Sequence, residues 1–378
     1  MKKIKVLHIL SMVGGLEICL RQIIENIDEK KIVSSVISQA TRNKEAIKTR
    51  SKKTVSHFYA PIYREINIFL DFWAVLKTIY FIKKEKPDLI HAHSSKAGVI
   101  ARIAALFFNL YVIYTPHAFS FLSTKNIIKK RFYISIEKIL KNKNVRILAT
   151  SESEQGQAIK KIGYKISQTK VLRNAIKYST SKIISHNFIK HNDFICTVGR
   201  PSYQKNIEML IKVFSHLKKK HKTLHLYIVG AGEYSPNTKN VEKIIKSEGL
   251  SKNITIIPWV SREEVAGIIK RAKLYVSTSR YEGMPYSVIE SLSLKKACVL
   301  TDCDGNRELI INDKTGYLIK GENIVEMSKK ISELLHDKTK RLKFGAAGYK
   351  LFVKNHSFEN YISNLTTYYQ NLSKQNRQ

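Results

Sequence analysis

The chain has 378 residues, of which 43% are hydrophobic and 25% are charged. This composition excludes a disordered, collagen-like or coiled-coil protein, and the length predicts two domains. Lysine and arginine number 66 against 30 aspartates and glutamates, which gives a net charge of +36. A charge of this size indicates a polyanionic partner, either nucleic acid or an anionic membrane surface.

Two apolar segments resemble targeting or membrane sequences. The first lies at the start of the chain, but it is short, contains His8 and lacks a small-residue cleavage site. We therefore expect a buried strand that runs into a glycine turn. The second, Ile103 to Thr124, is uncharged and contains Asn109, Pro116 and His117. These residues predict a helix, a turn and a strand rather than a transmembrane segment.

The first half of the chain alternates strand-like and helix-like patterns. Continuous apolar runs predict strands at 5–10, 31–38, 88–93, 111–116 and 145–150. Helical patterns lie at 15–27, 67–84, 96–108 and 127–141. Continuous rather than alternating apolar strands are typical of a parallel sheet covered by helices on both faces.

The alternation lapses in a polar stretch and then restarts. Further strands are predicted at 194–199, 224–230, 254–259, 274–279 and 297–302. The fold class is therefore α/β, with two doubly wound, Rossmann-like lobes. We expect lobes at 1–172 and 193–355, a linker at 173–192, and a final helix at 356–378 that packs on the first lobe.

Ligands of such sheets bind beyond the carboxyl ends of the strands, so two facing lobes predict a cleft between them. The four cysteines, at 19, 196, 298 and 303, have neither zinc-site nor disulfide spacing and are expected to be buried, reduced thiols. The first strand is followed by Gly14 and Gly15, which allow a ligand to approach the backbone at a helix N-terminus. A simple tight turn explains this pair equally well.

The strongest local signal is the segment Arg280 to Glu290, RYEGMPYSVIE. Glu282 lies in a turn after a strand, Pro285 suits the first position of a helix, and Glu290 lies within that helix. The helix N-terminus would bind phosphate, and the two carboxylates would accept hydrogen bonds from hydroxyl groups on either side of it. Solvated surface glutamates are the alternative.

A second signal follows the first strand of the second lobe, in VGRPSYQKN (198–206). Arg200 and Lys205 stand where two cations would bind a diphosphate. Ordinary surface basic residues are the alternative in a lysine-rich chain.

Together these motifs resemble the family-four glycosyltransferases of the two-Rossmann-lobe (GT-B) type, which retain configuration and use nucleotide sugars. The resemblance rests on the E-x7-E pair Glu282 and Glu290, on Arg200 and Lys205, on the first glycine turn and on TPH at 115–117. The segments 91–98 and 114–121 resemble bacterial members that build capsule and O-antigen repeat units.

The resemblance implies a role for each matching position. Arg200 and Lys205 would neutralise the diphosphate of the donor, and Glu290 would bind its ribose. Glu282 and His117 would lie at the donor sugar. The remaining donor contacts would come from Gly15, Gly283, Met284 and Pro285.

The resemblance also implies front-face attack, in which the leaving phosphate takes the acceptor proton and no protein nucleophile is needed. The chain departs from the family at Asn206, where glycine is common, and at 174–177, where N-G-[IV]-D has become NAIK. The second departure puts contacts from the linker in doubt.

Two metal sites compete with this interpretation. His91 and His93 share a strand face and His117 is expected on another strand, but no carboxylate or cysteine has matching spacing. Asp302 and Asp304 form a D-x-D motif, which the two-lobe group does not use. We expect neither to hold a metal and predict no cofactor besides the nucleotide-sugar co-substrate.

Basic residues are concentrated between Lys125 and Arg146, which contains eight basic residues and one acid, Glu137. Phe132, Tyr133, Ile134 and Ile136 alternate with them, and this pattern predicts a basic amphipathic helix with its apolar residues opposite the charges. Compositional lysine bias is the alternative.

The sequence thus predicts a cytoplasmic retaining glycosyltransferase, peripheral on the inner face of a bacterial plasma membrane. Its partners would be a UDP- or GDP-sugar, a polyprenyl-diphosphate-linked saccharide and an anionic membrane surface, without nucleic acid. One rival is a nucleic-acid-binding protein, which the charge alone suggests because recognition modules are missing. Another is a two-lobe epimerase that acts on the nucleotide sugar.

Overall fold

The computed structural model describes residues 3–12, 15–39, 46–63, 65–177, 189–232, 235 and 237–376. The chain divides into two compact units, one of residues 1–173 and 358–378 and the other of residues 174–357. Part of the predicted linker, at 178–188, lies outside the described residues, as does Gly14.

The first unit contains a seven-stranded parallel sheet in the order β3-β2-β1-β4-β5-β6-β7. Its strands are β1 (Ile4–Leu10), β2 (Ile32–Ser38), β3 (His57–Tyr59), β4 (Leu89–His93), β5 (Tyr111–Thr115), β6 (Val145–Ala149) and β7 (Thr169–Val171). Its helices are α1 (Gly15–Asn26), α2 (Ile68–Glu85), α3 (Ser95–Ala105), α4 (Ile127–Ile139), α5 (Glu152–Gln157) and the C-terminal α13 (Phe358–Gln375), with short turns at 120–122, 158–162 and 166–168.

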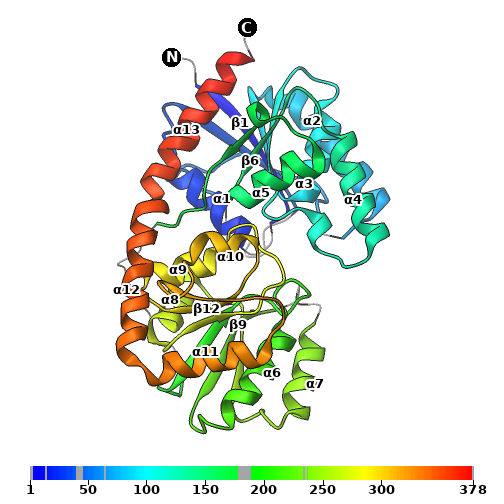
Figure 1. The fold of residues 1–378 in the computed structure, drawn as a ribbon. Coiled ribbons are helices and arrows are strands. Elements are labelled where there is room, and N and C mark those ends of the chain that lie inside the picture. The colour runs from blue at the N-terminus through cyan, green and yellow to red at the C-terminus, as the bar shows by residue number, and fades with distance from the viewer. Residues whose placement is uncertain are drawn as a thin grey trace. The chain divides into compact units, whose positions relative to one another are not determined.

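The second unit contains a six-stranded parallel sheet in the order β10-β9-β8-β11-β12-β13. Its strands are β8 (Phe194–Val198), β9 (His225–Ala231), β10 (Ile254–Pro258), β11 (Tyr275–Ser277), β12 (Cys298–Thr301) and β13 (Gly316–Ile319). Its helices are α6 (Ile207–Lys218), α7 (Thr238–Ser247), α8 (Arg262–Arg271), α9 (Tyr286–Ser293), α10 (Asp304–Leu309), α11 (Ile324–His336) and α12 (Lys338–Asn355). The parallel, doubly wound α/β architecture predicted from sequence is confirmed in both units (Figure 1).

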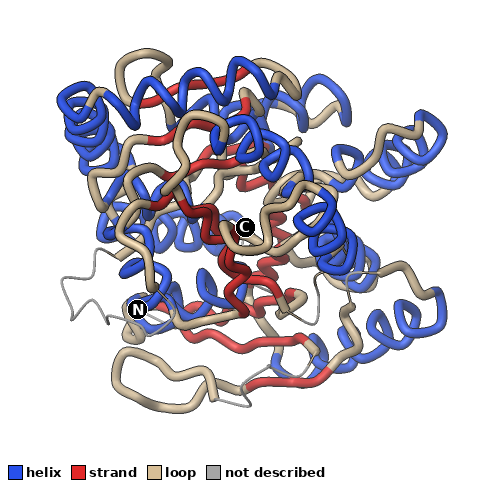
Figure 2. The backbone as a smooth tube through the Cα atoms, turned by 90° about the horizontal axis from the view of Figure 1, so that it is seen from below, coloured by secondary structure: helices blue, strands red, loops and turns tan. Residues whose placement is uncertain are grey.

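Helices cover both faces of the sheet in the second unit. Alternate residues of β8 face opposite ways: Ile195 packs in a core with α6, α7 and α11, and Cys196 packs in a core with α8, α9 and α12. Figure 2 shows the strands with helices on either side of them. The residues of both cores are almost completely excluded from water, which accounts for the continuous apolar strand sequences. The four cysteines are buried, and within the described part of the chain they form no disulfide.

In the first unit α13 lies on the sheet beside β1 and β4 (Figure 1). Tyr369 of this helix contacts a cluster of buried histidines on those two strands. His91 Nδ1 is 2.6 Å from the Tyr369 hydroxyl on α13, and His91 Nε2 is 2.9 Å from Thr115 Oγ1. His8 Nδ1 is 3.2 Å from His93 Nε2. These polar groups therefore satisfy one another where the final helix joins the sheet.

The predicted basic helix differs from its expected form. It ends at Ile139, so that Lys141 and Lys143 follow it and Arg146 lies in β6. Its single acid, Glu137, is buried and paired with Arg102 at 2.8 Å. The expectation that apolar residues lie opposite the charges holds in part: Tyr133 and Ile134 are partly buried against the core of the first unit, whereas Phe132 is exposed, as are the apolar residues at 127, 128 and 139. The buried ion pair joins α4 to α3, and the partly buried Tyr133 and Ile134 add apolar contacts to the core of the first unit.

The segment Ile103 to Thr124 divides between α3, β5 and a short turn, as predicted. Among the described residues, the structure contains no helix with the length and apolar character needed to cross a membrane.

Candidate functional site

Lys205 and Glu282, predicted from separate motifs, meet in the second unit. Lys205 lies in the turn between β8 and α6, and Glu282 lies in the turn between β11 and α9. The Lys205 ammonium is 2.6 Å from Glu282 Oε1. Because β8 and β11 are neighbours in a parallel sheet, their carboxyl ends bring these two turns together.

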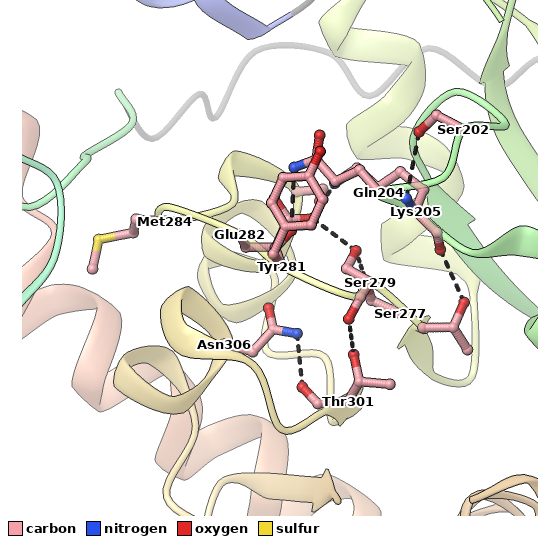
Figure 3. Close-up of polar contacts among 12 residues, drawn as sticks. Ser202, Gln204, Lys205, Ser277, Ser279, Tyr281, Glu282, Met284, Thr301 and Asn306 are labelled. Carbon is pink, nitrogen blue, oxygen red and sulfur yellow. Dashed lines mark hydrogen bonds and ion pairs between the residues drawn. The ribbon is translucent and has the colours of Figure 1, made fainter. Parts of the chain in front are cut away.

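Two further side chains hold the Glu282 carboxylate, which is buried (Figure 3). Ser279 Oγ donates to Oε1 at 2.7 Å, and Gln204 Nε2 donates to Oε2 at 3.1 Å. Both oxygens are therefore engaged and the carboxylate has a fixed orientation. Ser279 and Gln204 were missed by the sequence reasoning, although each lies within three residues of a predicted site residue.

The turn that carries Lys205 is fixed to the segment after β11. Thr278 Oγ1 donates to the carbonyl oxygens of Lys205 and Asn206, at 3.1 and 2.9 Å. The Arg280 guanidinium donates to the Tyr203 carbonyl at 2.7 Å and lies over the Tyr203 ring. These contacts fix the turn after β8 and the turn after β11 relative to one another.

Two backbone conformations in the first turn depend on residue type. Gly199 has φ +152°, and a Cβ added there would lie 2.8 Å from Lys205 Cε, so glycine leaves room for the lysine side chain. Asn206, which departs from the family pattern, has φ 48° and is the N-cap of α6. Asparagine adopts this left-handed conformation more readily than most residues, so it replaces glycine at little cost.

Arg200 lies in the same turn, directly after Gly199, and is partly exposed. The structure therefore places Arg200 and Lys205 within one strand-end turn, five residues apart in the chain.

The segment Glu282 to Pro285 is held on two sides. The Gly305 amide donates to the Glu282 carbonyl at 3.2 Å, and a Cβ at Gly305 would lie 2.3 Å from the Gly283 oxygen. On the other side Asn174 Nδ2 donates to the Met284 carbonyl at 2.8 Å. Despite the departure at 174–177, this residue keeps a contact to the predicted donor segment. Helix α9 begins at Tyr286, so Pro285 is its N-cap and not its first helical residue.

Glu290, in the second turn of α9, pairs with Arg262 at the start of α8. The Arg262 Nε is 2.8 Å from Glu290 Oε1. Burial raises the pKa of Glu290, and the Arg262 charge opposes that rise. Arg262 was missed by the sequence reasoning, because nothing in its local pattern links it to the E-x7-E motif.

Two predicted site residues belong to the first unit. His117 follows β5 with φ 52°, and its Nε2 is buried without a hydrogen-bond partner among the described residues. The next amide, of Ala118, donates to Glu154 Oε1 at 2.7 Å, and this bond fixes the turn. Burial lowers the pKa of His117 to about 4, so its ring is neutral at pH 7. Gly15 is the exposed first residue of α1.

The sequence suggested His91, His93 and His117 as the histidines of a possible metal site, but the structure groups a different set of three. His8 replaces His117: one ring nitrogen from each of His8, His91 and His93 lies within 4.8 Å of the others. The bond between His8 and His93 and the two hydroxyl contacts of His91 account for this proximity. We therefore interpret the cluster as neutral core histidines.

This cluster predicts that the free energy of unfolding falls below pH 6.5. Burial lowers the pKa of His8 to about 3 and those of His91 and His93 well below their usual value. The unfolded chain then binds more protons, so stability is complete above pH 6.5 and decreases as the pH falls towards 3. The titration of His8 alone should lower the free energy of unfolding by about 2 kcal/mol between pH 7 and pH 5. Urea midpoints at these two pH values test this.

The matched variant for that test is His8→Gln, which keeps polar atoms and removes the titration. Its midpoint is expected to change less between pH 7 and pH 5. An equal change in both proteins would contradict the assignment.

Both carboxylates of the D-x-D motif, Asp302 and Asp304, pair with one arginine side chain. Arg307 lies 2.7 Å from Asp302 Oδ1 and 3.4 Å from Asp304 Oδ1. Its single positive charge offsets one of the two negative charges and occupies oxygen atoms that a metal would need.

The chain resembles known protein families and relatives over most of its length. Residues 179–351 match the family "Glycosyl transferases group 1", and residues 13–179 match "Glycosyltransferase Family 4". An Escherichia coli UDP-Gal:alpha-D-GlcNAc-diphosphoundecaprenol alpha-1,3-galactosyltransferase is 27% identical and covers 75% of this chain and 76% of its own length. A Staphylococcus aureus capsular polysaccharide biosynthesis glycosyltransferase is 25% identical, with coverages of 77% and 78%.

The fold also matches a solved structure. Sucrose-phosphate synthase from Thermosynechococcus elongatus superposes with a TM-score of 0.84 at 16% identity, over 98% of this chain and 99% of that protein. The two family matches together span residues 13–351 and so include every predicted donor-site residue. The chain belongs to the family-four glycosyltransferases with the two-lobe GT-B fold, enzymes that transfer sugars from nucleotide sugars.

Proposed function

We propose that this glycosyltransferase moves a sugar, with retention of configuration, from a UDP- or GDP-sugar to a polyprenyl-diphosphate-linked saccharide in bacterial surface polysaccharide synthesis. The observation that carries the proposal is the pairing of Lys205 with Glu282, in a turn that also carries Arg200 and is fixed by Thr278. The names of the Escherichia coli and Staphylococcus aureus relatives support a lipid-linked acceptor and a capsule-type product.

In the proposed reaction Arg200 and Lys205 bind the donor diphosphate. The acceptor hydroxyl oxygen attacks the anomeric carbon on the face that the phosphate leaves, so one C–O bond forms as the other breaks. The proton of the hydroxyl passes to the departing phosphate oxygen. The two cations stabilise the negative charge that develops on that phosphate.

Glu282, already oriented by Ser279 and Gln204, accepts hydrogen bonds from the donor sugar. Glu290, which Arg262 holds in place, accepts hydrogen bonds from the ribose. The neutral His117 ring offers its unpartnered Nε2 to the sugar. Backbone groups of four residues complete the donor contacts: Gly15, Gly283, Met284 and Pro285.

The reaction is proposed to need no metal, because cationic side chains and the N-terminus of α9 neutralise the diphosphate. We expect activity to persist in EDTA at no less than about half its value in buffer alone. Nucleotide release with and without EDTA measures this. Complete loss that Mg²⁺ or Mn²⁺ restores would contradict the proposal and would assign Asp302 and Asp304 as ligands that displace Arg307.

The proposed location is the inner face of the plasma membrane, where a polyprenyl-linked acceptor is presented. An anionic surface is the proposed partner of the basic region from Lys125 to Arg146. In its helical part Lys129 and Arg131 are exposed. Each basic residue near an anionic bilayer contributes roughly 1 kcal/mol.

The experiment that tests the proposed function is a donor-hydrolysis screen over UDP- and GDP-sugars, with nucleotide release as the readout. Release from at least one donor is expected. DNA binding that weakens with salt, without release from any donor, would favour a nucleic-acid-binding protein. A converted nucleotide sugar without acceptor would favour an epimerase.

A further inference from the structure

Helix α2 of the first unit exposes a stripe of large apolar side chains. Phe69 is 84% exposed, Phe72 62% and Trp73 58%. The stripe continues along the helix and extends into the residues before it, and we define it as the α2 apolar face. Its members are Ile66, Ile68, Phe69, Phe72, Trp73, Leu76 and Tyr80, all exposed.

The fold itself does not require this face. Helix α2 packs on the first unit through Ala74, Thr78 and Ile82, which are its buried residues and lie four positions apart. Phe69, Phe72 and Trp73, at spacings of three and four, lie on another side of the helix. Contiguous exposed aromatic residues of this kind mark an interaction surface in a water-soluble protein.

The α2 apolar face begins at the edge of the sheet where strands β4 and β5 end. Lys96, at the start of α3, donates to the Glu65 carbonyl at 2.9 Å and pairs with Asp71. The neighbouring Ser95 accepts a hydrogen bond from the Ser120 amide at 3.1 Å, in the turn that leads to α4. The starts of α2, α3 and α4 are thus linked at this edge, which also carries His117 after β5.

The start of α4 adds both apolar and charged groups at the same edge. Ile127 and Ile128 are 60% and 76% exposed. Exposed basic residues accompany them, at Lys125, Lys129 and Arg131. Asp71 on α2 is paired with Lys96 of α3, so among the described residues Glu65 is the exposed acid that remains at the start of α2. Apolar residues and positive charge therefore occur together.

This combination selects one occupant. A second copy of the chain would bring two strongly basic surfaces together, at a net charge of +36 each. An anionic bilayer instead accepts apolar side chains into its acyl region and attracts the basic residues beside them. Tryptophan and tyrosine, present here as Trp73 and Tyr80, are enriched at membrane–water interfaces.

We propose that the α2 apolar face inserts into an anionic bilayer and is the hydrophobic anchor of the enzyme, with the basic residues of α4 as its electrostatic complement. The proposal rests on the proposed function in one respect, the lipid-linked acceptor. Insertion at this edge brings the bilayer to the strand ends that carry His117, so that the saccharide of such an acceptor reaches the site while its lipid chain stays in the membrane.

Trp73 reports directly on insertion, because the chain has only one other tryptophan, Trp259. In a Trp259→Phe protein the Trp73 emission should shift to shorter wavelength when vesicles of phosphatidylglycerol and phosphatidylcholine are added. Lipids brominated in their acyl chains should quench it at least about twofold. Neutral phosphatidylcholine vesicles should give much weaker changes.

The matched variants separate insertion from charge. Phe69→Ser with Phe72→Ser should lower partition onto anionic vesicles at least about tenfold. The control, Leu106→Ser with Phe107→Ser, removes apolar residues that are 64% and 69% exposed at the opposite end of α3, and should change partition less than twofold. The triple variant Lys129→Glu, Lys130→Glu and Arg131→Glu should weaken binding to anionic vesicles at low salt only.

The outcomes are distinct. Vesicle binding without a Trp73 shift or quenching would overturn the proposal and leave α4 as a purely electrostatic contact. A Trp73 shift that depends on protein concentration without vesicles would overturn it in favour of a second copy. The donor-hydrolysis screen is independent: its failure would remove the proposed function, while Trp73 quenching would still support the anchor.

Discussion

Replacing Arg200 or Lys205 by alanine is expected to lower kcat for sugar transfer by about 10²–10³-fold, with a smaller change in KM. Both residues lie in the turn after β8, where Thr278 and Arg280 hold the backbone in place. Their charges act mainly on the phosphate as it leaves, so their loss affects the transition state more than substrate binding. Steady-state kinetics with the preferred donor measure the effect.

Lys273→Ala is the matched control for this prediction. It removes the same charge from the same unit, but its partner is Asp193 at 2.6 Å, away from the Arg200 turn. Less than a twofold change in kcat is expected for this variant. Near wild-type turnover in Arg200→Ala would contradict the assignment of the diphosphate site.

Glu282→Ala is expected to lower kcat/KM at least about 10²-fold, because small displacements of reacting groups have effects of this size. The variant removes the acceptor shared by Lys205, Ser279 and Gln204, so the lysine loses its fixed position. Glu282→Gln keeps an acceptor oxygen and loses the charge, and its activity should be intermediate. Kinetics of both variants, with circular dichroism to verify folding, test this.

Glu333→Gln is the control for that series. Glu333 also binds a lysine, Lys340, at 2.8 Å, but on α11, and this contact lowers its pKa to about 2. The variant should lose stability and keep its activity. If Glu282→Ala retained full activity, the Lys205–Glu282 pair would be structural only.

Much of the fold could be predicted from sequence because central parallel strands are apolar throughout. The strands missed by this reasoning, β3, β7 and β13, each lie at the edge of a sheet. β3 and β7 are only three residues long, HFY and TKV, and both are incompletely buried. Short edge strands that are partly exposed to solvent lack the continuous apolar pattern that identifies the other strands.

The candidate site was predictable where a residue type matched a strand end, as for Lys205 and Glu282. Gln204, Thr278 and Arg262 were not, because their roles depend on which strands are neighbours and how helices pack. The α2 apolar face was hidden for a related reason. A helix with apolar residues all round is normally interpreted as buried, and only the fold shows which side is exposed.

The most direct test of the central claim is product analysis after incubation with the preferred nucleotide sugar and a polyprenyl-diphosphate-linked saccharide. The account predicts one nucleotide released for each sugar transferred, an α-glycosidic product from an α-linked donor by proton NMR, and loss of both signals in Lys205→Ala. An inverted anomeric centre would contradict the retaining mechanism. The absence of acceptor-dependent transfer from every UDP- and GDP-sugar would contradict the proposed function itself.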